Sequence, residues 1–113
     1  MKKVTTVYLA SPKKTVDSDI LNILKETHGE NTVIKTVGTP LMFNTPYGFS
    51  NLLQRRRQTI TKNTARVYVI QGDLKGCAFE NASTTGIPFG VLFRNEDKKW
   101  ETILLEGRVG ITA

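Results

Sequence analysis

Three short runs rich in β-branched residues, separated by two segments of helical periodicity, constrain the fold of this chain most. The runs occupy residues 4–10, 32–37 and 65–70, and the helical segments are predicted at 18–28 and 50–63. Two further runs, 89–94 and 99–106, flank residues 95–98 and predict a hairpin. Strands that are joined through a helix usually run parallel, with right-handed crossovers. The first three strands are therefore expected to pair in parallel.

We therefore predict an α/β fold: a mixed sheet of about five strands with two helices, in the order β-α-β-α-β-β-β. The alternative is an α+β fold in which an antiparallel sheet carries both helices on one face. A chain of 113 residues favours a single domain spanning residues 1–113. The polar stretch that follows Leu74 predicts a loop as far as Gly86, and residues 107–111 could add a short edge strand.

Residues that begin and end helices support both helical segments. Asp17 or Ser18 can accept backbone N–H groups at the start of the first helix, and Gly29 can supply the backbone conformation that ends it. Ser50 is the predicted cap of the second helix. The second helix carries few apolar residues, so its buried stripe is expected to be narrow.

The composition excludes several kinds of site. One cysteine, Cys77, cannot form an internal disulfide or a four-cysteine zinc site, and one histidine, His28, excludes a two-histidine metal motif. We expect no metal and no cofactor, and we predict no catalytic residue. The apolar runs are far shorter than the roughly 18–20 residues that span a bilayer, so no membrane partner is expected. Without an export signal, a cytoplasmic location is the expectation.

Positive charge is concentrated in the first half of the sequence. The chain has a formal net charge of +6, and residues 1–66 contain eleven Lys and Arg against four Asp and Glu. Three consecutive arginines lie within the second predicted helix, where successive residues turn by about 100°, so at least two of them must face solvent or a partner. Clustered guanidinium groups repel each other and bind phosphates in two-pronged contacts. This pattern indicates a surface for a polyanion.

An aromatic loop precedes the arginines, and aromatic rings beside arginine suit single-stranded nucleic acid, on which bases stack. In that loop Tyr47, between Pro46 and Gly48, is the residue most expected to be exposed, whereas Phe43 and Phe49 are better explained as core residues. The leading hypothesis is a small, basic, non-enzymatic nucleic-acid-binding accessory or regulatory protein. Its predicted nucleic-acid-binding residues are Arg55, Arg56, Arg57, Lys62, Lys13, Lys14 and Tyr47.

The same charge pattern permits a second function. A basic surface can also dock on an acidic protein, so the alternative is a protein-binding inhibitor or regulator with an acidic partner. A solvated basic face without any partner would give the same sequence pattern. The partner is thus expected to be either nucleic acid or an acidic protein.

A third hypothesis is a nucleotide-binding protein. In open α/β sheets ligands bind beyond the carboxyl ends of parallel strands, which here are Ser11, Gly38 and Gln71. The segment Val7-Tyr8-Leu9-Ala10-Ser11-Pro12 resembles the first strand and turn of nucleoside deoxyribosyltransferase-like enzymes.

That resemblance implies a catalytic glutamate near the start of a helix, after a turn of small residues. The corresponding region lies near Glu80, which precedes Ser83-Thr84-Thr85-Gly86 instead of following such a turn, and no long helix is expected after it. No catalytic residue is therefore carried over from the resemblance.

Overall fold

The computed structural model describes residues 5–11, 15–38, 45–62, 65–71 and 78–105. Its strands are β1 (Thr6–Ala10), β2 (Val33–Val37), β3 (Ala65–Ile70), β4 (Phe89–Arg94) and β5 (Trp100–Leu105). Its helices are α1 (Ser18–His28), α2 (Gly48–Arg55), α3 (Arg57–Thr61) and α4 (Ala78–Ser83). None of the helices in these ranges is long and apolar enough to cross a membrane. Lys13, Lys14, Phe43 and the predicted tail strand lie outside the described residues.

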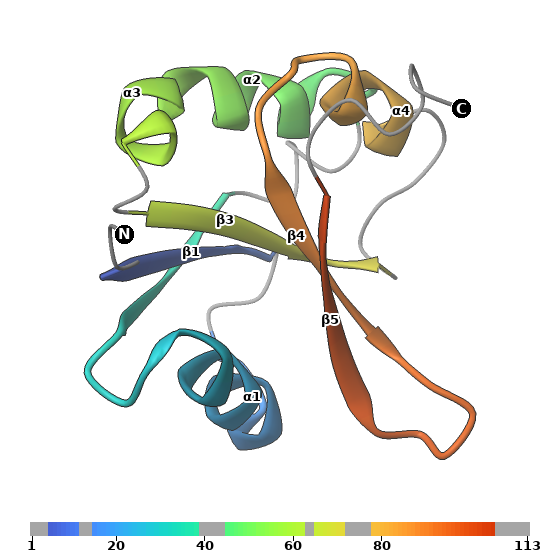
Figure 1. The fold of residues 1–113 in the computed structure, drawn as a ribbon. Coiled ribbons are helices and arrows are strands. Elements are labelled where there is room, and N and C mark those ends of the chain that lie inside the picture. Colours follow the sequence, from blue (N-terminus) through green and yellow to red (C-terminus); the bar gives the residue numbers. More distant parts are fainter. Residues whose placement is uncertain (1–4, 12–14, 39–44, 63–64, 72–77, 106–113) are drawn as a thin grey trace.

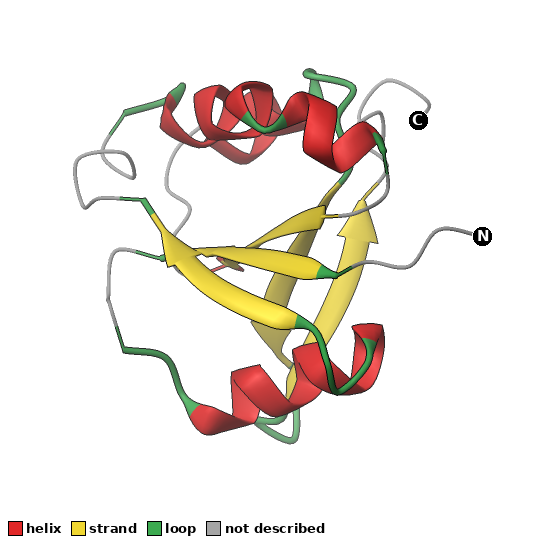
Figure 2. Cartoon of the chain, turned by 90° about the vertical axis from the view of Figure 1, so that its left-hand side faces the viewer, coloured by secondary structure: helices red, strands yellow, loops and turns green. Residues whose placement is uncertain are grey.

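The strands form one mixed sheet in the order β2-β1-β3-β4-β5. The pairings of β1 with β2, of β1 with β3 and of β3 with β4 are parallel, and β5 returns antiparallel to β4. This arrangement confirms the predicted α/β fold and not the antiparallel alternative. The sheet lies between two helical layers, with α1 on one face and α2, α3 and α4 on the other (Figures 1 and 2).

The two layers follow from the direction in which the chain moves across the sheet. From β1 the chain first steps outward to β2, then back past β1 to β3 and on to β4. Because right-handed crossovers in opposite directions place their helices on opposite faces, α1 is separated from α2, α3 and α4. The strand order therefore reverses between β1 and β3, which makes this point the topological switch of the sheet.

Each face of the sheet has its own apolar core. On the α1 face the buried residues are Val7, Leu9, Ile20, Leu24, Tyr68 and Leu92. On the other face they are Ala10, Phe49, Leu52, Leu53, Ile60, Val67, Val69, Ala82, Ile87, Phe89 and Val91. Burial on both faces explains why the central strands are almost continuously apolar in sequence.

The second predicted helix differs from the expectation of one helix over residues 50–63. The chain leaves helical geometry at Arg56, whose φ of −106° and ψ of 14° separate α2 from α3. Helix α2 also begins earlier, at Gly48, so Ser50 is not its cap; the buried Ser50 hydroxyl donates to the Tyr47 carbonyl at 3.0 Å. The prediction of a loop over residues 74–86 was wrong for the part that forms α4.

The first helix has the predicted bounds. Asp17 is at the N-cap position, but its side chain makes no capping hydrogen bond. Gly29 follows the helix with a φ of 113°, a conformation that a side chain would strain, and its N–H donates to the Lys25 carbonyl at 2.7 Å. Gly29 therefore ends the helix for the conformational reason that the sequence suggested.

The β4–β5 hairpin places a lysine in the left-handed region. Lys98 has a φ of 62°, and the Asn95 carboxamide oxygen closes the turn by accepting the backbone N–H groups of Asp97 and Lys99. A glycine adopts this conformation without steric cost.

We expect Lys98→Gly to raise the free energy of unfolding by about 0.5–1 kcal/mol, because it relieves this strain. Urea denaturation measures the change. Lys98→Ala removes the same charge and keeps the strain, so its stability should stay close to that of the parent protein. Equal stabilisation by both variants would attribute the effect to charge instead of backbone conformation.

A histidine–tyrosine pair joins α1 to the sheet. The Tyr68 hydroxyl lies 2.7 Å from His28 Nε2, and the two rings meet edge to face. Burial, together with the positive charge of Arg66, lowers the pKa of His28 below its usual value. Burial raises the pKa of Tyr68 to about 12, with a smaller opposing effect from Arg66. The pair is therefore built around a neutral imidazole and a protonated phenol.

The His28–Tyr68 pair makes the free energy of unfolding depend on pH. Because the pKa of His28 is lower in the folded protein, the unfolded chain binds a proton first as the pH falls through the histidine range. Acidification from pH 7 to pH 5 should therefore destabilise the protein. We expect His28→Gln to show a shallower loss of stability over this range, measured by urea midpoints at each pH. An unchanged slope in His28→Gln would show that other groups cause the dependence.

Candidate functional site

Three of the predicted nucleic-acid-binding residues are exposed basic residues on α2, on α3 or directly after α3. The side chains of Arg55, Arg57 and Lys62 are exposed, and none of them forms an ion pair with any residue in the described ranges. The break at Arg56 means that one continuous helical spacing does not relate Arg55 to Lys62. Below, the name basic helical layer refers to Arg55, Arg57 and Lys62.

Arg56 has a different environment from its two neighbours. Its guanidinium lies over the Tyr8 ring, 3.9 Å from the ring centroid, in a cation–π contact. The side chain is partly buried, and its buried Nε atom has no hydrogen-bond partner among the residues that the structure describes. Tyr8 is on β1, so the contact ties the junction between α2 and α3 to the sheet. Arg56 is thus better placed to hold the helical layer than to reach a ligand with its whole side chain.

The carboxyl ends of the parallel strands define a second region. At the switch point, Ser11 follows β1 and is buried, with its N–H donating to the Val37 carbonyl at 3.1 Å. Gln71 follows β3 and is exposed. Crevices at this position are the usual ligand sites of open α/β sheets.

A hydrogen bond joins two segments at this edge. The Asn81 side-chain amide on α4 donates to the Pro46 carbonyl before α2 at 2.6 Å, and α2 packs against α4. Tyr47 and Glu80 are the chain neighbours of these two residues, so the segments that carry them meet here. Tyr47 is 63% exposed, and Glu80 is exposed in the first turn of α4. This edge thus carries an exposed aromatic ring and an exposed carboxylate.

Glu80 is the candidate residue for which sequence reasoning found no role. The resemblance was not extended to Glu80 because this residue precedes the turn of small residues and because no long helix was expected after it; α4 has six residues. In the structure it lies near the start of a helix, after the connection that leaves β3. The available signal was the position of the glutamate one connection after a buried strand, which is where α/β proteins place functional groups.

The described residues contain no group of three His, Cys, Asp or Glu side chains arranged to hold a metal ion. No family model matches the chain, and neither a curated protein nor a solved structure matches it. Any functional assignment therefore has to come from the geometry of the two regions described above.

Proposed function

We propose that the carboxyl edge of the sheet binds a nucleoside or nucleotide and that Glu80 acts on its glycosidic bond. The observation that carries this proposal is the hydrogen bond between Asn81 and Pro46, which brings together the two segments that carry Glu80 and Tyr47. An exposed aromatic ring can stack on a base, and a carboxylate can attack the sugar carbon that carries the base. On sequence alone this was the third hypothesis, and the non-enzymatic nucleic-acid-binding function was the first.

The proposed reaction is a two-step transfer of a deoxyribosyl group. In the first step a Glu80 oxygen forms a bond to C1′, and the C1′–N bond breaks with its electron pair leaving on the base, which takes a proton from solvent. In the second step a nitrogen of another base forms a bond to C1′ and loses its proton to solvent, while the bond from C1′ to the Glu80 oxygen breaks and releases the carboxylate. A covalent sugar ester on a carboxylate is an established route in glycosyl chemistry. The resemblance of residues 7–12 to deoxyribosyltransferase-like enzymes suggests this reaction class but does not extend to Glu80, whose role is proposed from its position alone.

The test follows base exchange between 2′-deoxyadenosine and free cytosine by chromatography. We expect the parent protein to form 2′-deoxycytidine and adenine, and Glu80→Gln to lose this activity by about a thousandfold or more, as the loss of a covalent nucleophile does. Glu96→Gln, an exposed carboxylate in the hairpin, is the matched control and should keep full activity. Full activity in Glu80→Gln would overturn the proposed role of Glu80.

Binding is tested separately from turnover. Thermal unfolding with each 2′-deoxynucleoside and its 5′-monophosphate should show stabilisation, which reaches about 2.7 kcal/mol at a ligand concentration of 100 Kd. Tyr47→Ala should weaken this stabilisation, because the stacking ring is removed. If no nucleoside or nucleotide stabilises the parent protein, the carboxyl edge is not a nucleoside site.

A second candidate function is nucleic-acid binding through the basic helical layer. It is supported by the exposure of Arg55 and Arg57 and by their lack of ion pairs within the described residues. Phosphate contacts from such side chains release counterions, so binding should weaken steeply with salt. A cytoplasmic location and an accessory or regulatory role remain predictions attached to this candidate.

Fluorescence polarisation with a mixed single-stranded oligonucleotide, measured over a salt series, tests the second candidate. Arg55→Ala combined with Arg57→Ala should weaken binding and lower the salt slope by about 1.4, the value for two phosphate contacts on a single strand. Lys25→Ala combined with Lys99→Ala removes the same amount of charge elsewhere and should leave the affinity and the salt slope unchanged. If poly-L-glutamate binds and the oligonucleotide does not, the basic helical layer serves an acidic protein instead.

A further inference from the structure

Two adjoining clefts lie away from the basic helical layer, around the β4–β5 hairpin. One, of about 430 Å³, lies between α1 and the hairpin and is lined by Asn22, Lys98 and Lys99 among others. The other, of about 380 Å³, lies where β3 and β4 end and is mostly apolar, with Ile70, Leu92 and Phe93 in its lining. Arg94 and Trp100 line both clefts. We therefore treat the two clefts as one site that shares these two side chains.

Arg94 is held in place by an aromatic ring and a weak ion pair. Its guanidinium lies 4.7 Å from the centroid of the Trp100 ring, and its Nη2 lies 3.9 Å from a carboxylate oxygen of Asp17. The Arg94 and Asp17 side chains are 53% and 64% exposed, and an ion pair of that length and exposure contributes little. Arg94 is thus a preoriented cation whose present carboxylate partner is easily replaced by a ligand anion.

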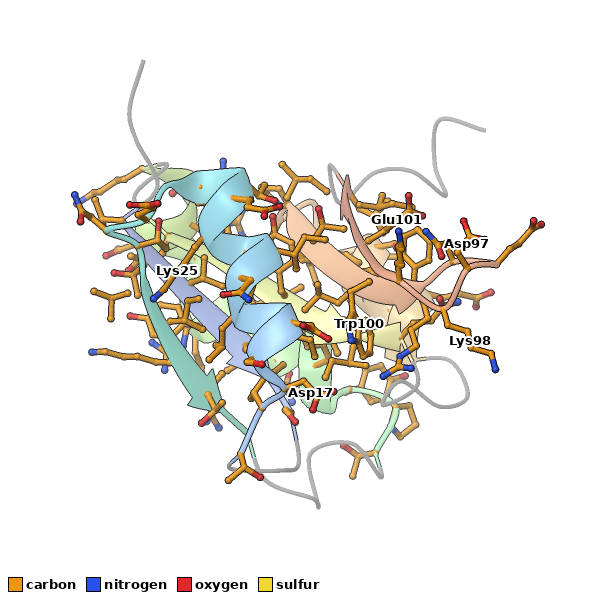
Figure 3. All side chains as sticks on the ribbon, turned by 90° about the horizontal axis from the view of Figure 1, so that it is seen from below. Asp17, Lys25, Asp97, Lys98, Trp100 and Glu101 are labelled. Atoms are coloured by element: carbon orange, nitrogen blue, oxygen red, sulfur yellow. The ribbon has the colours of Figure 1, made fainter. Side chains whose placement is uncertain are left out.

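Figure 3 looks onto α1 and shows how the parts of this site are arranged. Trp100 lies beside the end of α1 near Asp17, and Lys98 projects from the hairpin further out. The α1 side of the larger cleft also carries Asp19 and Glu26. These carboxylates disfavour a highly charged anion, so the anionic group must sit toward the hairpin cations and carry few charges.

From this arrangement we infer a small-molecule site for a planar ring that carries one phosphate, such as a nucleoside monophosphate. The ring would occupy the apolar cleft, where Phe93 and Trp100 supply aromatic surface and Gln71 supplies an amide that can both donate and accept at a base edge. The phosphate would take the place of the Asp17 carboxylate on Arg94, in the two-pronged contact that a guanidinium makes with phosphate. The inference does not depend on Glu80 or on base exchange.

Trp100 is the single tryptophan of the chain, so its fluorescence reports directly on this site. We expect adenosine 5′-monophosphate to change the emission in a saturable way, and adenosine to bind at least tenfold more weakly because it lacks the phosphate. Inorganic phosphate alone should compete with the monophosphate but bind weakly. Absence of a fluorescence change with millimolar monophosphate, or equal affinities for monophosphate and adenosine, would overturn the inference.

Three variants separate the site from the rest of the molecule. Arg94→Gln should raise the Kd for the monophosphate at least tenfold, to a value near that for adenosine. Asp17→Asn should lower the Kd severalfold, because Arg94 loses its competing carboxylate, an effect that general loss of structure would not produce. Glu80→Gln should leave the Kd unchanged even when it abolishes base exchange, which keeps the outcome independent of the proposed function. An unchanged Kd in both Arg94→Gln and Asp17→Asn would contradict the site.

Discussion

Replacing Gly90 by alanine should destabilise the protein by about 2–3 kcal/mol, the usual cost of overpacking a filled core. Gly90 is on β4 directly opposite Tyr68 of the neighbouring strand. A Cβ built on Gly90 would overlap the Tyr68 ring at its Cδ2, Cε2 and Cζ atoms. Tyr68 is 1% exposed, and its hydroxyl is hydrogen-bonded to His28, so the ring cannot move aside without breaking that hydrogen bond. Urea denaturation of Gly90→Ala measures the loss.

The cause can be isolated by changing the ring as well. In a Tyr68→Leu background, Gly90→Ala should cost much less, because the ring that it strikes is gone, whereas in a Tyr68→Phe background the full cost should remain. The difference between the two backgrounds is the coupling between Gly90 and the ring. A cost that is the same in both backgrounds would place the strain elsewhere in β4.

Replacing Phe49 by alanine should destabilise the protein by about 3–5 kcal/mol, the range for removal of a buried aromatic side chain. Phe49 is 1% exposed and meets Phe89 edge to face, with 5.4 Å between ring centroids. It joins the first turn of α2 to the sheet, so its loss also loosens the helical layer that carries Arg55. Thermal or urea unfolding measures the effect.

Tyr47 provides the matched control, since it is an aromatic residue two positions away with most of its surface exposed. Tyr47→Ala should change stability by less than about 0.5 kcal/mol, as exposed substitutions usually do. Phe49→Leu should lose less than Phe49→Ala because it leaves a smaller cavity. Equal destabilisation at positions 47 and 49 would contradict the assignment of Phe49 alone to the core.

The sequence predicted correctly those helices and strands in which the residues of the local apolar pattern are also the residues buried in the folded protein. The bounds of α1, β3 and β4 match the expectation, because an amphipathic period or a continuous β-branched run also marks the residues that are buried. The exposure of Tyr47 was also predicted, and so was that of at least two of the three arginines, since a narrow apolar stripe cannot bury consecutive arginines; the exposed two are Arg55 and Arg57.

The differences arise where a distant contact decides local structure. Arg56 divides α2 from α3 while stacking on Tyr8, which is far away in sequence and gives no local signal. Helix α4 is short and contains Asn81 and Ser83, which favour turns, yet packing on α2 and the bond from Asn81 to Pro46 support it. The pairing of Arg94 with Trp100 depends on hairpin register, in which the two residues lie opposite each other.

The strand order also determines when the chain can complete its fold. The interior strand β1 pairs Thr6 with Val33 on one side and with Ala65 on the other, so both of its partner strands are synthesised after it. During synthesis β1 must wait with one edge unpaired until β3 has emerged, and refolding must close the same long loops before those contacts form. We therefore expect slower folding than in a helical bundle of equal length. The β4–β5 hairpin joins neighbouring segments, so it can form without waiting for the pairing of β1 with β3.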